Sequence, residues 1–196
     1  FVSVLVLLAG ITCSLTRSNF KRGIKTLLCG LLITAVMAVV MPDSLIVFGI
    51  LHFFGTAMLI YSALGKLLEK IPVAVGIPLF FLLFMFTWRL MYGKLGVFDF
   101  WTFDTFKVPN SLVLFILGFD VPIYSADYYP LMPWIFLFFV GTFLGRFFKN
   151  GTAPKFFKAD VLQPIGFIGR HTLIIYLLHQ PIIYGAMYLF FEVFKA

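Results

Sequence analysis

Two histidines and a glutamine inside apolar stretches are the side chains of this sequence best suited to chemistry. His179 and Gln180 stand just before Pro181 in the last apolar run, and His52 stands in an earlier one. An ionisable side chain inside a membrane-spanning helix is costly and is usually functional. Counted from Arg170 at one membrane face, His179 lies roughly 13 Å into a hydrocarbon core about 30 Å thick. These residues predict a polar site near the middle of the membrane.

The chemistry that suits such a site is acyl transfer. A histidine that titrates near neutral pH can take a proton from an amine or a hydroxyl. Pro181 offers no amide to the carbonyl of Leu177, so the helix is expected to bend there. His179 and Gln180 beside that carbonyl can polarise a thioester carbonyl. The alternative, which spacing leaves open, is that the histidines are packing residues bonded to neighbouring helices.

His52 is expected at the same depth as His179, approached from the other side. Counted from Ser44 as the start of a helix, it lies about 12 Å deep. Gly49, His52 and Thr56 fall on one face of that helix. Small residues beside a histidine indicate that two helices pack closely there. We therefore expect His52 to support the site that contains His179.

The elements that must position these residues are membrane helices. The sequence is 62% hydrophobic and only 12% charged, with a mean hydropathy of +1.05, far from the quarter of charged residues usual in soluble domains. We predict an all-α, polytopic transmembrane bundle that forms a single domain over 1–196. The expected spans number about six: 1–15, 26–41, 44–64, 71–91, 130–148 and a last one from 169. The apolar segment around 111–119 is too short to cross and is expected to be re-entrant or interfacial.

The positive charge of the chain predicts its orientation. Fifteen Lys and Arg stand against eight Asp and Glu, and the predicted spans place most of the cations in loops on one side, which is then cytoplasmic. The expected location is the cell (cytoplasmic) membrane, and nothing indicates a nucleic-acid partner. The carboxylates of the long outer segment 92–129, at Asp99, Asp104, Asp120 and Asp127, are expected to form a solvated rim rather than an acid–base pair.

The cytoplasmic cations suit the phosphates of an acyl-CoA. The alternative for each of them is a charge that sets topology against lipid headgroups. The sequence has no GxSxG, Walker, HExxH or CxxC motif, so no metal site is predicted, and Cys13 and Cys29 are read as packing residues. The candidate cofactor-binding residues are Arg17, Lys21, Arg22, Arg146, Arg170 and His171.

Four segments of the chain resemble bacterial membrane proteins of the heparan-α-glucosaminide N-acetyltransferase-like family. The resemblance covers essentially the whole chain, and its last segment is the most specific. The segments are residues 7–19 (LLAGITCSLTRSN), 48–55 (FGILHFFG), 125–134 (SADYYPLMPW) and 169–181 (GRHTLIIYLLHQP).

The resemblance implies a multi-pass acyltransferase that takes acetyl-CoA from the cytoplasm and acylates a sugar on the far side of the membrane. It places His179 at the family's C-terminal histidine, Arg17 in the inner loop after the glycine motif, and His52 in a helix that lines the core. The family's Asp-x-x-Arg-Gly element, with the histidine or asparagine that follows it, has no counterpart here. We expect it, and the principal catalytic base, on a segment upstream of Phe1.

The predicted function is therefore a membrane acyltransferase that moves an acyl group from acyl-CoA to a carbohydrate or envelope acceptor. Its candidate catalytic groups are His179, His52 and Gln180. A proton-coupled transporter or flippase is the main alternative, and a membrane-embedded assembly subunit is a third. The expected partners are the bilayer, acyl-CoA and the acceptor, and the sequence leaves open whether the chain forms a homo-oligomer.

Overall fold

The computed structural model describes residues 2–97, 101–105, 108–147, 149, 182, 185–187, 189 and 190. The chain divides into two compact units, Phe1–Ala153 and Pro154–Ala196, and each is described by itself. In the second unit the described residues are helical, and most of the predicted last span lies outside them. The prediction of a single domain stays a prediction.

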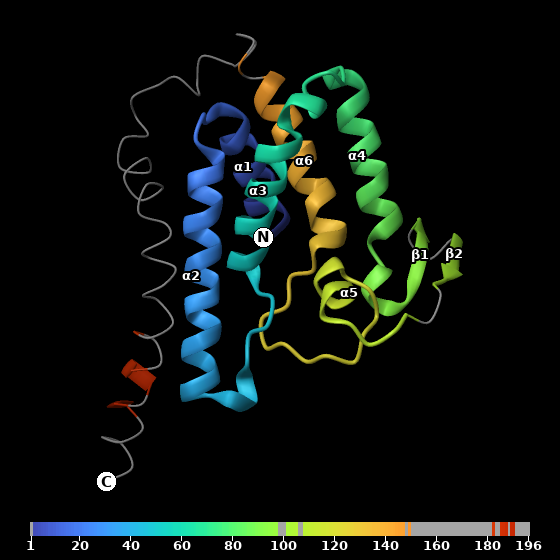
Figure 1. Ribbon diagram of the computed structural model, residues 1–196. Helices are drawn as coiled ribbons and strands as arrows, with labels where there is room; N and C mark the ends of the chain where they lie inside the picture. The colour runs from blue at the N-terminus through green and yellow to red at the C-terminus, as the bar shows by residue number, and fades with distance from the viewer. Residues whose placement is uncertain are drawn as a thin grey trace. The chain divides into compact units, whose positions relative to one another are not determined.

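The first unit is a bundle of helices with one small hairpin (Figure 1). A six-residue helix, α5, and the hairpin fill the segment between the two last long helices. The elements are α1 (Val2–Leu15), α2 (Asn19–Val40), η1 (Pro42–Ser44), α3 (Ile50–Leu68), α4 (Val73–Thr87), η2 (Leu90–Tyr92), β1 (Lys94–Val97), β2 (Trp101–Asp104), α5 (Leu112–Leu117) and α6 (Leu131–Phe147).

Three helices of the described residues are long and apolar enough to cross a membrane, at Asn19–Val40, Ile50–Leu68 and Val73–Tyr92. The apolar helices Val2–Leu15 and Leu131–Phe147 are shorter. The mostly helical membrane fold is thus confirmed, whereas six spans stay a prediction. The strands β1 and β2 are a departure from the all-α expectation.

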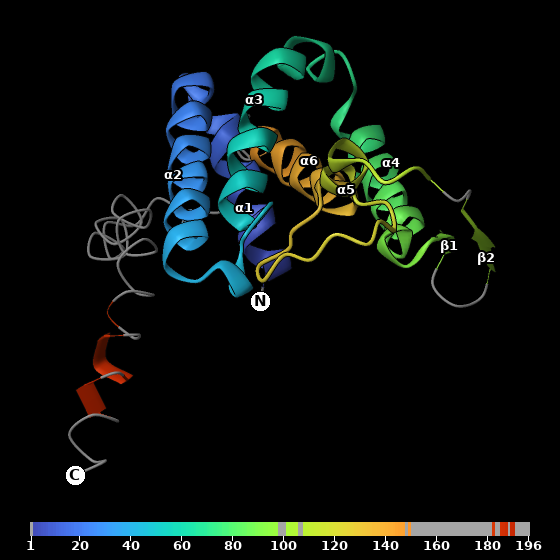
Figure 2. The same ribbon diagram turned by 60° about the horizontal axis from the view of Figure 1, so that its bottom comes forward.

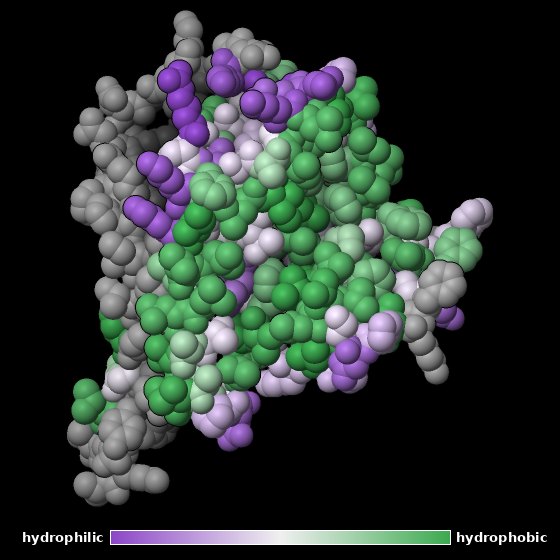
Figure 3. Space-filling view, in the orientation of Figure 1, coloured by the Kyte–Doolittle hydropathy of each residue, from purple (hydrophilic) through white to green (hydrophobic). Residues whose placement is uncertain are grey.

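The surface agrees with a membrane environment. Side chains of α2 such as Leu32, Val39 and Val40 are 60%, 83% and 62% exposed, which in water would be an unusually large apolar patch. Figure 3 shows hydrophobic residues over the middle of the visible face and hydrophilic ones gathered toward its two ends. The exposed apolar band is the surface expected to face lipid.

The helices pack in pairs through small residues. In α1 and α6, Gly10 and Gly141 lie against each other's backbone, and Gly145 lies against Ser14, so the two helices run parallel. In the α2–α3 pair, a Cβ on Gly55 would lie 2.7 Å from the Cβ of Leu27. Small residues let helix backbones approach closely, which drives helix association where water cannot.

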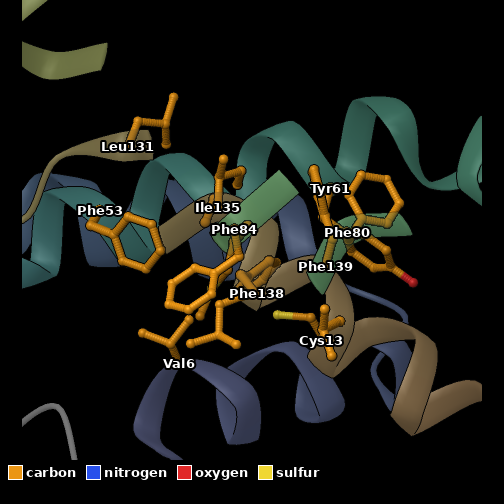
Figure 4. Close-up of a cluster of buried hydrophobic side chains, with 14 of the residues drawn as sticks. Val6, Cys13, Phe53, Tyr61, Phe80, Phe84, Leu131, Ile135, Phe138 and Phe139 are labelled. Carbon is orange, nitrogen blue, oxygen red and sulfur yellow. The ribbon is translucent and has the colours of Figure 1, made fainter. Parts of the chain in front are cut away.

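Large aromatic and aliphatic side chains fill the space between these pairs. Figure 4 shows side chains from α1, α3, α4 and α6 turned toward one another. Phe80 of α4 lies between the rings of Phe139 and Phe143 of α6, with centroids 5.2 and 5.6 Å away. In Figure 2 the same helices again lie side by side.

We define two ends of the bundle by charge. The basic end is formed by the turns between α1 and α2 and between α3 and α4, and by the last turn of α6. It carries Arg17, Lys21, Arg22, Lys25, Lys66, Lys70 and Arg146. The opposite end carries η1, the hairpin and α5.

Candidate functional site

The structure describes five of the predicted site residues and leaves four outside the described residues. Those described are His52, Arg17, Lys21, Arg22 and Arg146. Those outside are His179, Gln180, Arg170 and His171, so their roles stay predictions.

His52 lies in the first turn of α3, not in the third turn as expected, because the helix begins at Ile50 rather than Ser44. Its side chain is nevertheless deep, being only 3% exposed. A Cβ on Gly30 of α2 would lie 3.1 Å from His52 Nδ1. Gly30 stands at the middle of α2, about 15 Å along the helix axis from Val40. The non-helical segment 45–49 carries the chain inward before the helix starts.

Both ring nitrogens of His52 are hydrogen-bonded. The amide of Gly49 donates to Nδ1 at 3.2 Å, and Nε2 lies 3.3 Å from Thr34 Oγ1. Thr34 Oγ1 in turn donates to the carbonyl of Ile46 at 2.6 Å. Because Nδ1 accepts a hydrogen bond, the neutral ring carries its proton on Nε2 and donates it to Thr34. In this arrangement His52 is a positioning residue that holds segment 45–49 against α2.

Asp127 caps the start of α3 from 77 residues away in the sequence. Its Oδ2 accepts the amide hydrogen of Ile50 at 3.1 Å and lies against Gly49, where a Cβ would collide with it. A carboxylate at this position satisfies one of the unpaired amides of the helix and interacts favourably with the helix dipole. Burial raises the pKa of Asp127 above its usual value, while the Ile50 amide and His52 act in the opposite direction.

The expectation of a solvated carboxylate rim is therefore wrong for Asp127. Asp104 and Asp120 are exposed, as a rim requires, but Asp127 is half-buried. Local sequence could not reveal its partner, since Ile50 lies 77 residues away at the start of α3. One sequence feature does indicate a buried role for Asp127: it is the single carboxylate in the otherwise uncharged segment 125–134.

The whole segment 125–129 pairs with the non-helical segment 45–49. The amide of Ala126 donates to Leu45 O at 3.0 Å, and the amide of Tyr129 donates to Phe48 O at 3.1 Å. Between them, Ser125 Oγ accepts the amide hydrogen of Val47 at 3.0 Å. Backbone amides and carbonyls outside helices need partners wherever they are shielded from water, and these bonds supply them.

At the basic end, the turn between α1 and α2 has features that favour an anion. Arg17 and Lys21 are exposed, and Arg22 donates to Thr16 Oγ1 at 3.1 Å. Ser18 stands at the N-cap of α2 and makes no side-chain cap bond. First-turn amides and cations at the start of a long helix attract negative charge. The predicted start of this helix at Thr26 is wrong, since it begins at Asn19 and includes the cations.

Asn19 adds a polar group inside this turn. Its Nδ2 donates to Cys13 O at 2.7 Å and to Thr16 O at 3.0 Å, which closes the end of α1. Its Oδ1 is buried and has no hydrogen-bond partner. A buried acceptor without a donor costs free energy, so this atom would gain from a ligand that brings an N–H or O–H group.

Arg146 holds backbone carbonyls at the end of α3. Its Nη1 donates to Leu68 O at 3.0 Å and to Ile71 O at 3.2 Å, and its Nη2 donates to Glu69 O at 3.1 Å. The guanidinium lies 5.0 Å from the ring centroid of Phe143. Helix C-termini leave carbonyls unpaired, and a cation there also complements the helix dipole. Arg146 thus joins α6 to the α3–α4 turn, and its contact with a CoA phosphate stays a prediction.

Arg146→Gln is expected to lower the free energy of unfolding by about 2 kcal/mol, because three carbonyls lose charge-assisted donors. Arg146→Lys keeps the charge but not the planar fork, so we expect about half that loss. The measurement is unfolding of the purified protein in detergent. Lys70→Gln, an exposed charge at the same end, is the control and should change stability by less than about 0.5 kcal/mol. Equal losses for Lys70→Gln and Arg146→Gln would contradict the assigned role.

A cavity of about 270 Å³ lies at the opposite end, between α5 and the segment that follows it. Tyr128 forms part of its wall, stacked on Phe115 with centroids 4.3 Å apart, and its hydroxyl donates to Phe115 O at 2.6 Å. Burial raises the pKa of Tyr128 to about 12, so it is a neutral donor. No motif in the sequence indicates this cavity. Its lining residues are Met91, Phe115, Phe119, Asp120, Val121, Ile123, Tyr124, Ser125 and Tyr128.

Among the residues that the structure describes, no group of three or more His, Cys, Asp or Glu side chains could hold a metal ion. Cys13 and Cys29 are not joined in a disulfide. Cys13 is fully buried in the core, which agrees with its reading as a packing residue.

The chain was compared with families of known proteins. A family model described as "Heparan-alpha-glucosaminide N-acetyltransferase, catalytic" matches residues 1–181. No curated protein and no solved structure matches the chain. The matched range includes His52, Asp127 and the basic end, and it reaches past His179 to Pro181.

Proposed function

Because the chain belongs to the heparan-α-glucosaminide N-acetyltransferase catalytic-domain family, we propose that it is a membrane-embedded acyltransferase that moves an acetyl group from cytoplasmic acetyl-CoA to a sugar or envelope acceptor across the membrane. The family match over residues 1–181 carries the proposal, and it indicates membrane acetyltransferase-type activity. The donor, the acceptor and the direction of transfer are the proposed parts.

The basic end supports acetyl-CoA as the donor. Acyl-CoA is made in the cytoplasm, where the positive-inside rule puts loops rich in Lys and Arg. Arg17, Lys21 and Arg22 stand around the start of α2, where cations and helix amides together suit phosphates. Asn19 Oδ1 is a buried acceptor without a partner, and an amide N–H of the pantetheine arm is a donor of the right kind.

The proposed reaction is nucleophilic attack by the acceptor on the thioester. The acceptor amine or hydroxyl forms a new bond to the carbonyl carbon, the carbon–sulfur bond breaks, and the proton lost by the acceptor is finally carried by the CoA thiol. In the proposal His179 moves that proton and Gln180 polarises the carbonyl. His52 has both nitrogens bonded, so its proposed part is to fix the backbone of segment 45–49.

Binding and transfer assays on the full-length protein test the proposal separately. Arg17→Ala/Arg22→Ala is expected to weaken acetyl-CoA binding in detergent about tenfold, because each exposed cation–phosphate contact is worth somewhat under 1 kcal/mol. Lys66→Ala/Lys70→Ala removes the same charge from the other turn of the basic end and should bind like wild type. His179→Ala should bind acetyl-CoA normally but transfer no labelled acetyl group to an amino sugar in proteoliposomes. Failure of the wild-type protein to bind acetyl-CoA would contradict the proposal.

One observation favours the transporter as a second candidate. Segment 45–49 is a non-helical stretch beside the C-terminal half of α2, where Ile46 O is bonded to Thr34, and non-helical backbone beside membrane helices is common at transporter binding sites. A transporter would move the sugar into vesicles that contain no acetyl-CoA, with a rate that depends on pH. The acyltransferase proposal predicts no such uptake.

A further inference from the structure

The hairpin formed by β1 and β2 has one apolar face and one polar face. The antiparallel register pairs Leu95 with Phe103 and Val97 with Trp101. Directly paired residues lie on the same face of a sheet, and residues two apart in a strand share that face. One face therefore carries Leu95, Val97, Trp101 and Phe103. The other face carries Lys94, Gly96, Thr102 and Asp104, with Lys94 opposite Asp104.

The apolar face is largely uncovered. Trp101 is 75% exposed, Phe103 is 62% exposed and Val97 is 44% exposed. A two-stranded hairpin is at best marginally stable in water by itself. Figure 3 shows the hairpin projecting from the side of the bundle with hydrophobic residues at its surface. The bundle therefore leaves these apolar side chains uncovered, and an apolar environment outside it would stabilise them.

The place of the hairpin along α4 identifies that environment. The candidate membrane span ends at Tyr92, two residues before β1 begins at Lys94. The amide of Lys94 donates to Arg89 O at 3.2 Å, and the amide of Thr105 donates to Gly93 O at 2.7 Å, so both strands are attached to the end of the span. Figures 1 and 2 both show β1 beside the end of α4.

Other aromatic residues mark the same level as a membrane interface. Trp88, at the end of α4, packs edge-on against Trp134 of α6 with ring centroids 5.6 Å apart. Tryptophan is enriched where hydrocarbon meets headgroups, because its ring is apolar and its N–H is polar. The hairpin thus lies at the boundary of the leaflet farthest from the basic end.

We propose that the apolar face of this hairpin is a membrane-interface anchor, with Trp101 and Phe103 inserted at the headgroup–acyl boundary of that leaflet and Lys94 and Asp104 turned to water. Lipid is favoured over a second copy of the chain because four side chains offer far less than the roughly 800 Å² per partner of a stable interface. The exposed apolar surface of α4, which includes Phe81 and Leu82, belongs to the span that leads directly to the hairpin. The inference does not depend on the enzymatic activity.

Nitroxide labels on four consecutive residues of β2 test the anchor. Trp101, Thr102, Phe103 and Asp104 are each replaced by Cys in the full chain with Cys13→Ala and Cys29→Ala, labelled, and reconstituted in phosphatidylcholine vesicles. Collision rates with oxygen report lipid exposure, and those with a polar nickel chelate report water exposure. We expect the oxygen-to-nickel ratio to alternate with a period of two, several-fold higher at positions 101 and 103 than at 102 and 104.

Three outcomes would overturn the anchor. High nickel accessibility at all four positions would put the hairpin in water. Positions 101 and 103 shielded from both reagents, with spin–spin broadening, would put a second copy on the face. Shielding that appears only when an acceptor oligosaccharide is added would assign the face to sugar.

The unlabelled protein supplies an independent measurement. Lipids brominated near the headgroup should quench part of the tryptophan fluorescence, and Trp101→Phe should lower the quenched fraction, the remainder coming from Trp88 at the same level. Unchanged quenching in Trp101→Phe would count against insertion of this side chain.

Discussion

Gly141→Ala is expected to lower the free energy of unfolding by about 3 kcal/mol, since overpacking against a backbone leaves no side chain that could rotate away. A Cβ at this position would collide with the carbonyl oxygen of Leu7 and lie 3.1 Å from the Cα of Gly10. The parallel helices α1 and α6 would have to separate. Van der Waals packing between closely spaced helix backbones is a main attraction between helices in lipid. Separating α1 from α6 would therefore weaken packing along the whole contact.

Gly65→Ala is the matched control, because it is the same substitution in a helix where the new methyl group meets nothing within 4 Å. Alanine there should stabilise the protein by about 0.5–1 kcal/mol, since glycine loses more backbone freedom on folding. Unfolding of both variants in the same detergent gives the comparison. Opposite signs support the assigned helix contact, and equal stabilisation by both substitutions would contradict it.

Asp127→Ala is expected to cost about 2–3 kcal/mol, because the part-buried amide that this carboxylate caps is left without an acceptor. The amide is that of Ile50, and Asp127 Oδ2 is its partner in this structure. The loss should appear in unfolding experiments and as faster amide hydrogen exchange at Ile50. Unchanged exchange at Ile50 would contradict the cap.

Asp127→Asn separates the hydrogen bond from the charge. The amide oxygen can still accept from Ile50, so the exchange rate should stay close to wild type. Burial raises the pKa of Asp127 in the folded protein, so the folded state holds this proton to higher pH than the unfolded state does. The contribution of Asp127 to stability is then full below its unfolded pKa and declines as pH rises through the folded pKa. Asp127→Asn should remove this decline in the free energy of unfolding. A pH profile of stability that is the same in Asp127→Asn and wild type would contradict the raised pKa of Asp127.

The helical order and direction were predictable because they depend on local hydropathy and charge. Runs of apolar residues broken by Arg and Lys clusters predict the ends of helices. The antiparallel contact of α2 with α3 and of α4 with α6 follows the predicted alternation. The family was predictable as well, from the segments around His52 and before Pro181, and the family match confirms it.

The start of α3 was not predictable from its own residues. Segment 45–49 is as apolar as the helix that follows it, so hydropathy extends the helix back to Ser44. What stops it is a set of bonds from segment 125–129, far away in the sequence. Asp127 was misassigned for the same reason, since solvation of a carboxylate depends on which distant backbone lies beside it.

Arg146 and the hairpin show two further features that are hard to predict from the sequence. Because Arg146 lies at the basic end, the sequence predicts that it is available to phosphates. In the structure its guanidinium instead donates to carbonyls at the end of α3. Strand signals were present in the alternating residues 94–104. Strands of only four residues between helices are too short to stand out from the surrounding apolar pattern. His179 and Gln180 lie outside the described residues, so the central pair of the predicted site stays a prediction.

The pairing of segments 45–49 and 125–129 also sets an order of events during synthesis. Ile50 leaves the ribosome 77 residues ahead of Asp127, a delay of roughly 4–15 s at about 5–20 residues per second. Until then the amides of Val47 and Ile50 and the carbonyls of Leu45 and Phe48 lack these partners and cannot be released into hydrocarbon at low cost. The second and third helices must therefore wait beside the translocon, or under the cover of a chaperone, for a piece of the chain that has not yet been translated.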